Sequence, residues 1–180
     1  VYKRQVLSIC GVIRFFSINS KYPQNEKVVY KMGDSFVCQN AKFTITDTYM
    51  LKRMDIMNDD DLSEYLEENS DYLKSEDLNL GLIKIIISNT TDDEITVDLT
   101  AFHIESGAFS LQFYYPLVMY YNDCGMYIKL SKGEQKTFIA PVPISSEQFL
   151  NYDSTDIRNR TYYLVSSLYP QKIMSEVKFN

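Results

Sequence analysis

The sequence is poor in the residues from which most metal and cofactor sites are built. Its 180 residues include 3 cysteines, 6 glycines and 1 histidine. Cys10, Cys38 and Cys124 form no C-x-x-C pair, which excludes a zinc ribbon and a thioredoxin-type redox site. The glycines form neither G-x-x-x-x-G-K-S/T nor G-x-G-x-x-G, the motifs that hold nucleotide phosphates. We therefore expect neither a cofactor nor a metal site.

Positive charge is also scarce. The chain has 18 Lys and Arg against 24 Asp and Glu, a formal net charge of −6. Because Lys and Arg supply most of the affinity for a phosphate backbone, we expect no nucleic-acid partner. Ten of the 24 acids fall between residues 55 and 77, so the rest of the chain is close to neutral.

Long apolar runs are missing. The longest apolar stretch, residues 6–18, is interrupted by Arg14, and a membrane span needs about 20 apolar residues. We interpret residues 1–18 as the remnant of a signal peptide or signal anchor. The polar residues 19–31 are then a linker to a domain over 32–180. The alternative is that the apolar stretch is a first buried strand or helix of the domain.

The cysteines leave two further questions open. Leu7-Ser8-Ile9-Cys10 has the outline of a lipobox, but the residue before a lipobox cysteine is normally small and Ile9 is not. We therefore favour a plain anchor over lipidation of Cys10. In an exported chain Cys38 and Cys124 can pair, although isolated cysteines are more often small buried hydrophobes.

Short strands with period-two alternation occupy most of the chain. In residues 41–49, Phe43, Ile45 and Tyr49 share one face and polar residues share the other, which is typical of a half-buried strand. The segment 82–99 contains two such runs around Thr-Thr-Asp-Asp and predicts a hairpin. A further strand pair is predicted within residues 126–140, and the last two strands are predicted over residues 162–168 and 172–179.

One segment has a helical period instead. Between residues 59 and 74, Leu62, Tyr65, Leu66 and Leu73 recur at offsets of three, four and seven among many acids. This predicts one acidic surface helix inserted between strands. The predicted fold is mostly β, an immunoglobulin-like antiparallel β-sandwich of about seven to nine strands.

Turn and strand motifs carry a family resemblance. They are Tyr30-Lys31-Met32-Gly33-Asp34, the strands and turn between Ile85 and Leu99, and Leu130-Ser131-Lys132-Gly133-Glu134. Over residues 28–180 the chain resembles the telokin-like, immunoglobulin-like domains of unknown function in Gram-positive bacterial envelope proteins and lipoproteins. The resemblance implies an extracytoplasmic, membrane-anchored or secreted domain, and it carries no catalytic residue.

Tyrosines are concentrated in residues 113–127. Tyrosine combines an apolar ring with a polar tip and suits recognition of a partner. Neighbours on a strand point to opposite faces, so an extended backbone would expose one tyrosine of each adjacent pair. We therefore predict a non-catalytic module that binds an envelope or other cell-surface partner, with the acidic helix as a second candidate surface. The candidate residues are Tyr114, Tyr115, Tyr120, Tyr121 and Tyr127.

Two alternatives remain open. One is a hydrolase of envelope polymers that uses His103 or a carboxylate pair as acid or base. No G-x-S-x-G motif or recognisable catalytic cysteine accompanies His103, so we do not expect an enzyme. The other is a purely structural spacer.

Overall fold

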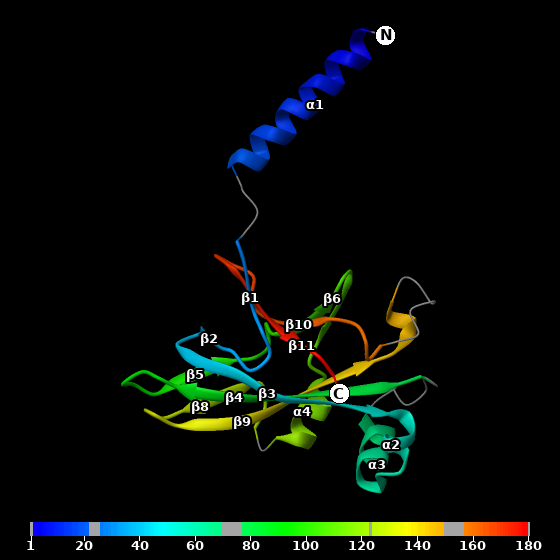
Figure 1. Ribbon diagram of the computed structural model, residues 1–180, viewed down its shortest axis with the longest axis vertical. Coiled ribbons are helices and arrows are strands. Elements are labelled where there is room, and N and C mark those ends of the chain that lie inside the picture. Colours follow the sequence, from blue (N-terminus) through cyan, green and yellow to red (C-terminus); the bar gives the residue numbers. More distant parts are fainter. Residues whose placement is uncertain (1, 22–25, 70–76, 123, 150–156, 180) are drawn as a thin grey trace.

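Eleven strands form the body of the described chain, which comprises residues 2–21, 26–69, 77–122, 124–149 and 157–179 of the computed structural model (Figure 1). One sheet has the order β1 (Lys27–Tyr30), β11 (Lys172–Val177), β10 (Tyr162–Ser167), β6 (His103–Ser106) and β7 (Phe109–Gln112). A second has the order β2 (Ser35–Cys38), β3 (Ala41–Lys52), β4 (Asn79–Asn89) and β9 (Gln135–Ile144). The third pairs β5 (Ile95–Asp98) with β8 (Tyr127–Leu130). The predicted mostly β sandwich is confirmed, with more strands than expected and with β1 and β11 parallel.

The described helices are α1 (Tyr2–Lys21), α2 (Arg53–Met57), α3 (Asp60–Asn69) and α4 (Tyr115–Tyr121), with a 3-10 turn η2 (Ser146–Gln148). The predicted acidic helix is α3, and residues 70–74 of that prediction lie outside the described chain. Its first turn is capped by Asp59, whose Oδ1 accepts a hydrogen bond from the Leu62 N–H at 3.1 Å. The prediction of a single inserted helix is wrong, because α2 and α4 accompany α3.

Two apolar clusters lie on opposite faces of the four-stranded sheet. Alternate residues of β4 explain this: Ile83, Ile85 and Ile87 enter the main core, whereas Leu80 enters a second cluster. The main core lies between the sheets, and its rings of Phe36 and Phe43 stack with centroids 5.3 Å apart. The second cluster fills the space under α2, α3 and α4, and its buried members are Ile56, Leu62, Leu66, Leu78, Leu80 and Leu117.

The predicted hairpin over residues 82–99 is wrong. Strand β4 pairs with β3 and β9, whereas β5 pairs with β8. After β4 the chain crosses to the sheet of β5 and β8, and the Asn89 side chain holds this crossing in place. Its Nδ2 donates to the carbonyls of Asp93, Leu130 and Ser131 at 2.7, 3.1 and 3.0 Å. The pair expected within residues 126–140 is also wrong, because β8 pairs with β5 and β9 pairs with β4. The last two predicted strands are present as β10 and β11, which pair with each other.

Strand β3 also departs from its predicted facing. The register with β4 shifts between Ile45 and Asp47, and an extra residue reverses the faces that follow it. Phe43 and Ile45 are buried as expected, but beyond the shift Thr48 is buried and Tyr49 is 49% exposed.

Helix α1 stands apart from the sandwich in Figure 1. Its described side chains are exposed. The expected linker 19–31 is only partly a connection, because residues 19–21 end α1 and Lys27–Tyr30 form β1. No helix in the described chain combines the length and the apolar character that crossing a membrane requires. The side chain of Cys10, on which the lipobox hypothesis depends, is not among those described.

Candidate interaction surface

Helix α4 holds most of the tyrosines predicted to bind a partner. Pro116 lies in its first turn, where proline fits a helix without loss of a hydrogen bond. Leu117 and Val118 are buried, which fastens the helix against the sandwich. The condition set above, an extended backbone at both tyrosine pairs, is therefore met only at Tyr114, the residue just before the helix, because Tyr115, Tyr120 and Tyr121 are helical.

The outer side of α4 is apolar and exposed. Tyr115 is 55% exposed and Met119 is 45% exposed, and their spacing of four residues puts them side by side on the helix. Gly125 lies against both: a Cβ on it would come within 3.7 Å of the Tyr115 ring and 3.8 Å of the Met119 sulfur. Tyr127, on β8, is 62% exposed. We call Tyr115, Met119 and Gly125 the α4 patch.

The remaining candidate tyrosines pack against the sandwich. Tyr114, Tyr120 and Tyr121 are half-buried against the second apolar cluster. The Tyr120 ring lies between those of Tyr65 and Tyr121, with both centroid distances 5.0 Å. Tyr65 donates its hydroxyl hydrogen to the Pro116 carbonyl at 2.8 Å, which ties α3 to α4. These three tyrosines hold α4 in position rather than offer free contact area.

The acidic end of α3 lies beside these rings. Burial, and then the carboxylates of Asp59 and Asp61, raise the pKa of Tyr120. Burial, followed by Tyr120 and Asp59, raises the pKa of Tyr121 further. Both hydroxyls stay protonated at neutral pH and remain hydrogen-bond donors.

Sequence reasoning missed Met119 and the positioning residues Tyr65 and Asn122. Asn122 follows α4 and pairs with the backbone of Ile139 in β9. Pro116 was the available signal for α4, because proline is favoured in the first turn of a helix and is excluded from a central strand.

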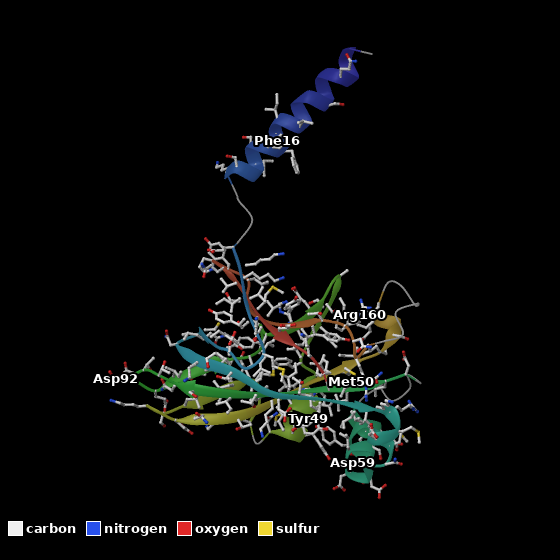
Figure 2. The ribbon with its side chains drawn as sticks, viewed as in Figure 1. Phe16, Tyr49, Met50, Asp59, Asp92 and Arg160 are labelled. Atoms are coloured by element: carbon white, nitrogen blue, oxygen red, sulfur yellow. The ribbon has the colours of Figure 1, made fainter. Side chains whose placement is uncertain are left out.

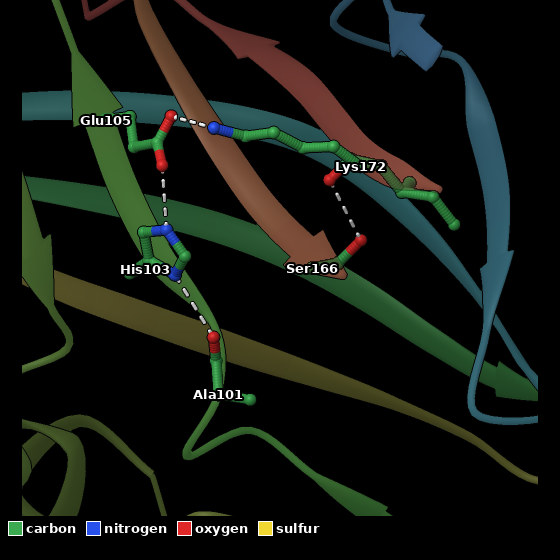
Figure 3. Close-up of polar contacts among 6 residues, drawn as sticks. Ala101, His103, Glu105, Ser166 and Lys172 are labelled. Carbon is green, nitrogen blue, oxygen red and sulfur yellow. Dashed lines mark hydrogen bonds and ion pairs between the residues drawn. The ribbon is translucent and has the colours of Figure 1, made fainter. Parts of the chain in front are cut away.

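A second polar constellation lies on the five-stranded sheet, around His103 (Figure 3). Its Nε2 lies 3.0 Å from Glu105 Oε1 and its Nδ1 lies 3.1 Å from the Ala101 carbonyl. Lys172 of β11 donates to Glu105 Oε2 at 2.5 Å. Burial acts to raise the pKa of Glu105, but the hydrogen bonds and charges of Lys172 and His103 outweigh it, and the pKa is lowered.

This constellation has a histidine and a carboxylate but lacks a nucleophile. Both ring nitrogens of His103 face oxygen acceptors, and both can donate only when the ring is protonated. Among the described residues no serine or cysteine side chain is bonded to His103; Ser166 instead donates to the Ile173 carbonyl at 3.5 Å. Through Glu105 these contacts link β6 to β11.

The described cysteines and carboxylates form no further cluster. Neither Cys38 nor Cys124 is in a disulfide, so the pairing left open above does not form. Burial raises the pKa of the Cys38 thiol, which lies 3.5 Å from the Ser166 carbonyl oxygen. Within the ranges that the structure describes, no group of three His, Cys, Asp or Glu side chains is arranged to hold a metal ion.

Residues 19–173 match the family "Domain of unknown function (DUF5028)". The chain belongs to this family. No curated protein sequence matches the chain significantly.

Several solved structures are similar to this chain at low sequence identity. A putative lipoprotein, YcdA of Bacillus subtilis, is 13% identical with a TM-score of 0.51, over 80% of this chain and 38% of that one. The chain thus spans well under half the length of that protein. An uncharacterised β-sandwich protein of Clostridium difficile is 12% identical with a TM-score of 0.45, over 86% of this chain and 98% of the other.

Proposed function

We propose that this member of the family is a non-catalytic binding module held at the outer face of a bacterial membrane by its N-terminal segment. The observation that carries the binding role is the α4 patch. Tyr115 and Met119 leave apolar area in solvent although Leu117 and Val118 of the same helix are fully buried. Exposed aromatic and methionine side chains on a fixed helix are the composition of protein interfaces.

Two features support the extracytoplasmic position. The described apolar side chains of α1, among them Phe15 and Phe16 at 60% and 66% exposed, have no place in the sandwich. The B. subtilis protein with the same fold is described as a putative lipoprotein. An apolar helix outside the domain core is stable when a membrane surface covers it.

The test needs variants that remove contact area and keep the fold. Substituting Tyr114, Tyr120 or Tyr121 would damage the second cluster, so the informative variant is Tyr115→Ser with Met119→Ser. The matched control is Tyr49→Ser. Tyr49 is 49% exposed, between the values of Met119 and Tyr115, but it lies on β3 and outside the α4 patch. Folding of both variants is checked by urea unfolding.

The full chain is used to capture a partner from detergent-solubilised envelope, and binding of that purified partner is then measured. We expect the α4 variant to bind at least about tenfold more weakly, the loss of two interface anchors, and the control to bind normally. Equal binding by all three proteins would overturn the assignment of the patch. Absence of any specific partner would favour the spacer alternative.

A further inference from the structure

The turn between β10 and β11 presents an unusual amount of apolar surface. Tyr169 is 81% exposed, the highest value among the large hydrophobic side chains of the described residues, and Leu168 beside it is 55% exposed. The turn is nevertheless well defined, because the paired strands β10 and β11 flank it and the Ser167 hydroxyl donates to the Tyr169 carbonyl at 3.1 Å. A ring held out in this way is available for contact.

The turn between β10 and β11 lies close to the segment that leads from α1 into β1. The backbone N–H of Lys172 donates to the Glu26 carbonyl at 2.8 Å, and Gln171 Nε2 donates to Glu26 Oε2 at 2.9 Å. Glu26 follows Lys21, the last residue of α1, by five positions. Five residues span at most about 17 Å, so the turn cannot lie far from the end of α1. Figure 1 shows the start of β1 and the start of β11 side by side.

The distribution of charge indicates how the domain is oriented when α1 is at a membrane. Asp59 and the acidic helix α3 that follows it lie at the end of the long axis opposite α1 and its Phe16 (Figure 2). Lys21 and Lys27 lie on either side of the connection to α1. A bilayer with anionic headgroups attracts the lysines and repels the acids. When α1 is at a membrane, the turn therefore faces the bilayer and α3 points away from it.

We propose that Leu168 and Tyr169 enter the headgroup region of the bilayer to which α1 is attached, as a second membrane contact of the domain. Tyrosine is favoured at membrane interfaces because its ring enters the apolar boundary while its hydroxyl stays hydrated. Two side chains would not hold a free protein there. They suffice here because α1 keeps them at high effective concentration near the surface. This inference rests on the membrane attachment in the proposed function.

The absence of tryptophan makes a direct test possible. The chain contains 0 Trp, so Tyr169→Trp gives a full-length protein with a single fluorescent reporter in the turn. The matched control is Tyr127→Trp, because Tyr127 is 62% exposed and its strand, β8, lies away from α1 in Figure 1. Each protein is mixed with vesicles of phosphatidylcholine and phosphatidylglycerol, with and without bromine on the acyl chains.

We expect the reporter at 169 to shift to shorter wavelength and to lose about half of its emission in brominated vesicles, as interfacial tryptophan does. The reporter at 127 should be unchanged. Adding Leu168→Ser to the first variant should reduce the quenching. Emission at 169 that is insensitive to bromine in protein bound to vesicles would overturn the proposal.

Flotation of the vesicles separates this result from the attachment itself. A chain that does not float with them contradicts membrane attachment through α1. In that case a histidine tag at the N-terminus and nickel-chelating lipids hold the same protein at the surface, and the reporter at 169 is measured again. Quenching there supports the turn contact without α1, and its absence overturns the contact as well.

Discussion

The carboxamide of Asn122 pairs with the backbone of Ile139 as a neighbouring strand would. The Ile139 N–H donates to Asn122 Oδ1 at 2.8 Å, and Asn122 Nδ2 donates to the Ile139 carbonyl at 2.9 Å. Strand β9 is an edge of its sheet, and unpaired edge groups invite pairing with other chains. Two residues further along, Pro141 has no N–H, and its carbonyl accepts from the Tyr114 N–H at 3.2 Å. The same contacts that fix α4 therefore close the edge of the sandwich.

Asn122→Ala should destabilise the protein by about 2 kcal/mol, because it leaves partly buried groups of β9 without partners. Gln39→Ala is the matched control, since Gln39 makes the same reciprocal pair with the backbone of Asp98, at 2.7 Å each, in an exposed place. We expect the control to lose less than about 1 kcal/mol in urea unfolding. Equal losses would show that closing the β9 edge adds nothing.

Ser175→Ala should stabilise the protein. Ser175 is fully buried, and no group of the described chain hydrogen-bonds to its hydroxyl. Removing an unsatisfied buried hydroxyl should raise the free energy of unfolding by about 1 kcal/mol. Ser106→Ala is the opposite case, because Ser106 is buried and donates to the Thr161 carbonyl at 2.9 Å. It should lose a similar amount in the same urea titration, and a loss at Ser175 would contradict the prediction.

The sequence predicted the sandwich because alternation along single strands is a local signal. The alternation of Ile83, Ile85 and Ile87 indicates a strand with one buried face, whichever strands pair with it. The choice of partner strand is not local. It depends here on contacts such as those of Asn89 with residues 130 and 131, 41 and 42 positions away, so the two predicted hairpins were wrong.

The candidate site was predicted in part for a similar reason. Its tyrosines were found by composition, but their exposure depends on whether α4 is a helix, and burial of Leu117 and Val118 decides that. His103 and Glu105 share a face of one strand, which the sequence shows, whereas Lys172 reaches them only through the pairing of β6, β10 and β11.

Glu105 should make stability depend on pH in acid. The folded pKa of Glu105 is lowered, so its contribution is complete above the ordinary glutamate value of about 4.3. That contribution is lost as the pH falls through the folded pKa. Glu105→Gln should therefore be less stable than wild type at pH 7, and the difference should shrink toward pH 3, as measured by urea unfolding.

The control is Asp92→Asn, which removes an ion pair with Lys132 whose side chains are 89% and 68% exposed. Such a pair contributes little, and this variant should follow the wild type at each pH. If the difference in the free energy of unfolding between wild type and Glu105→Gln stays constant from pH 7 to pH 3, the effect comes from altered packing or hydrogen bonding and not from the charge of Glu105.

Gly81 and Phe179 should be strongly coupled. A Cβ on Gly81 would lie 2.6 Å from Phe179 Cζ and 2.8 Å from Cε1, so the ring covers the place of a side chain. The same ring meets Tyr162 edge-on at 5.2 Å and thus joins β4 to β10. The Lys178 carbonyl accepts from Thr48, which holds this segment against β3. Phe179 therefore closes the core between the two larger sheets.

Gly81→Ala should cost about 2 kcal/mol through overpacking, and Phe179→Ala about 3 kcal/mol through the cavity it leaves. In the double variant the new methyl group enters the vacated space, so the combined loss should fall below the sum by at least about 1 kcal/mol. Urea unfolding of the four proteins gives this coupling free energy. Additive losses would mean that the strand backbone, rather than the Phe179 ring, is what requires glycine at position 81.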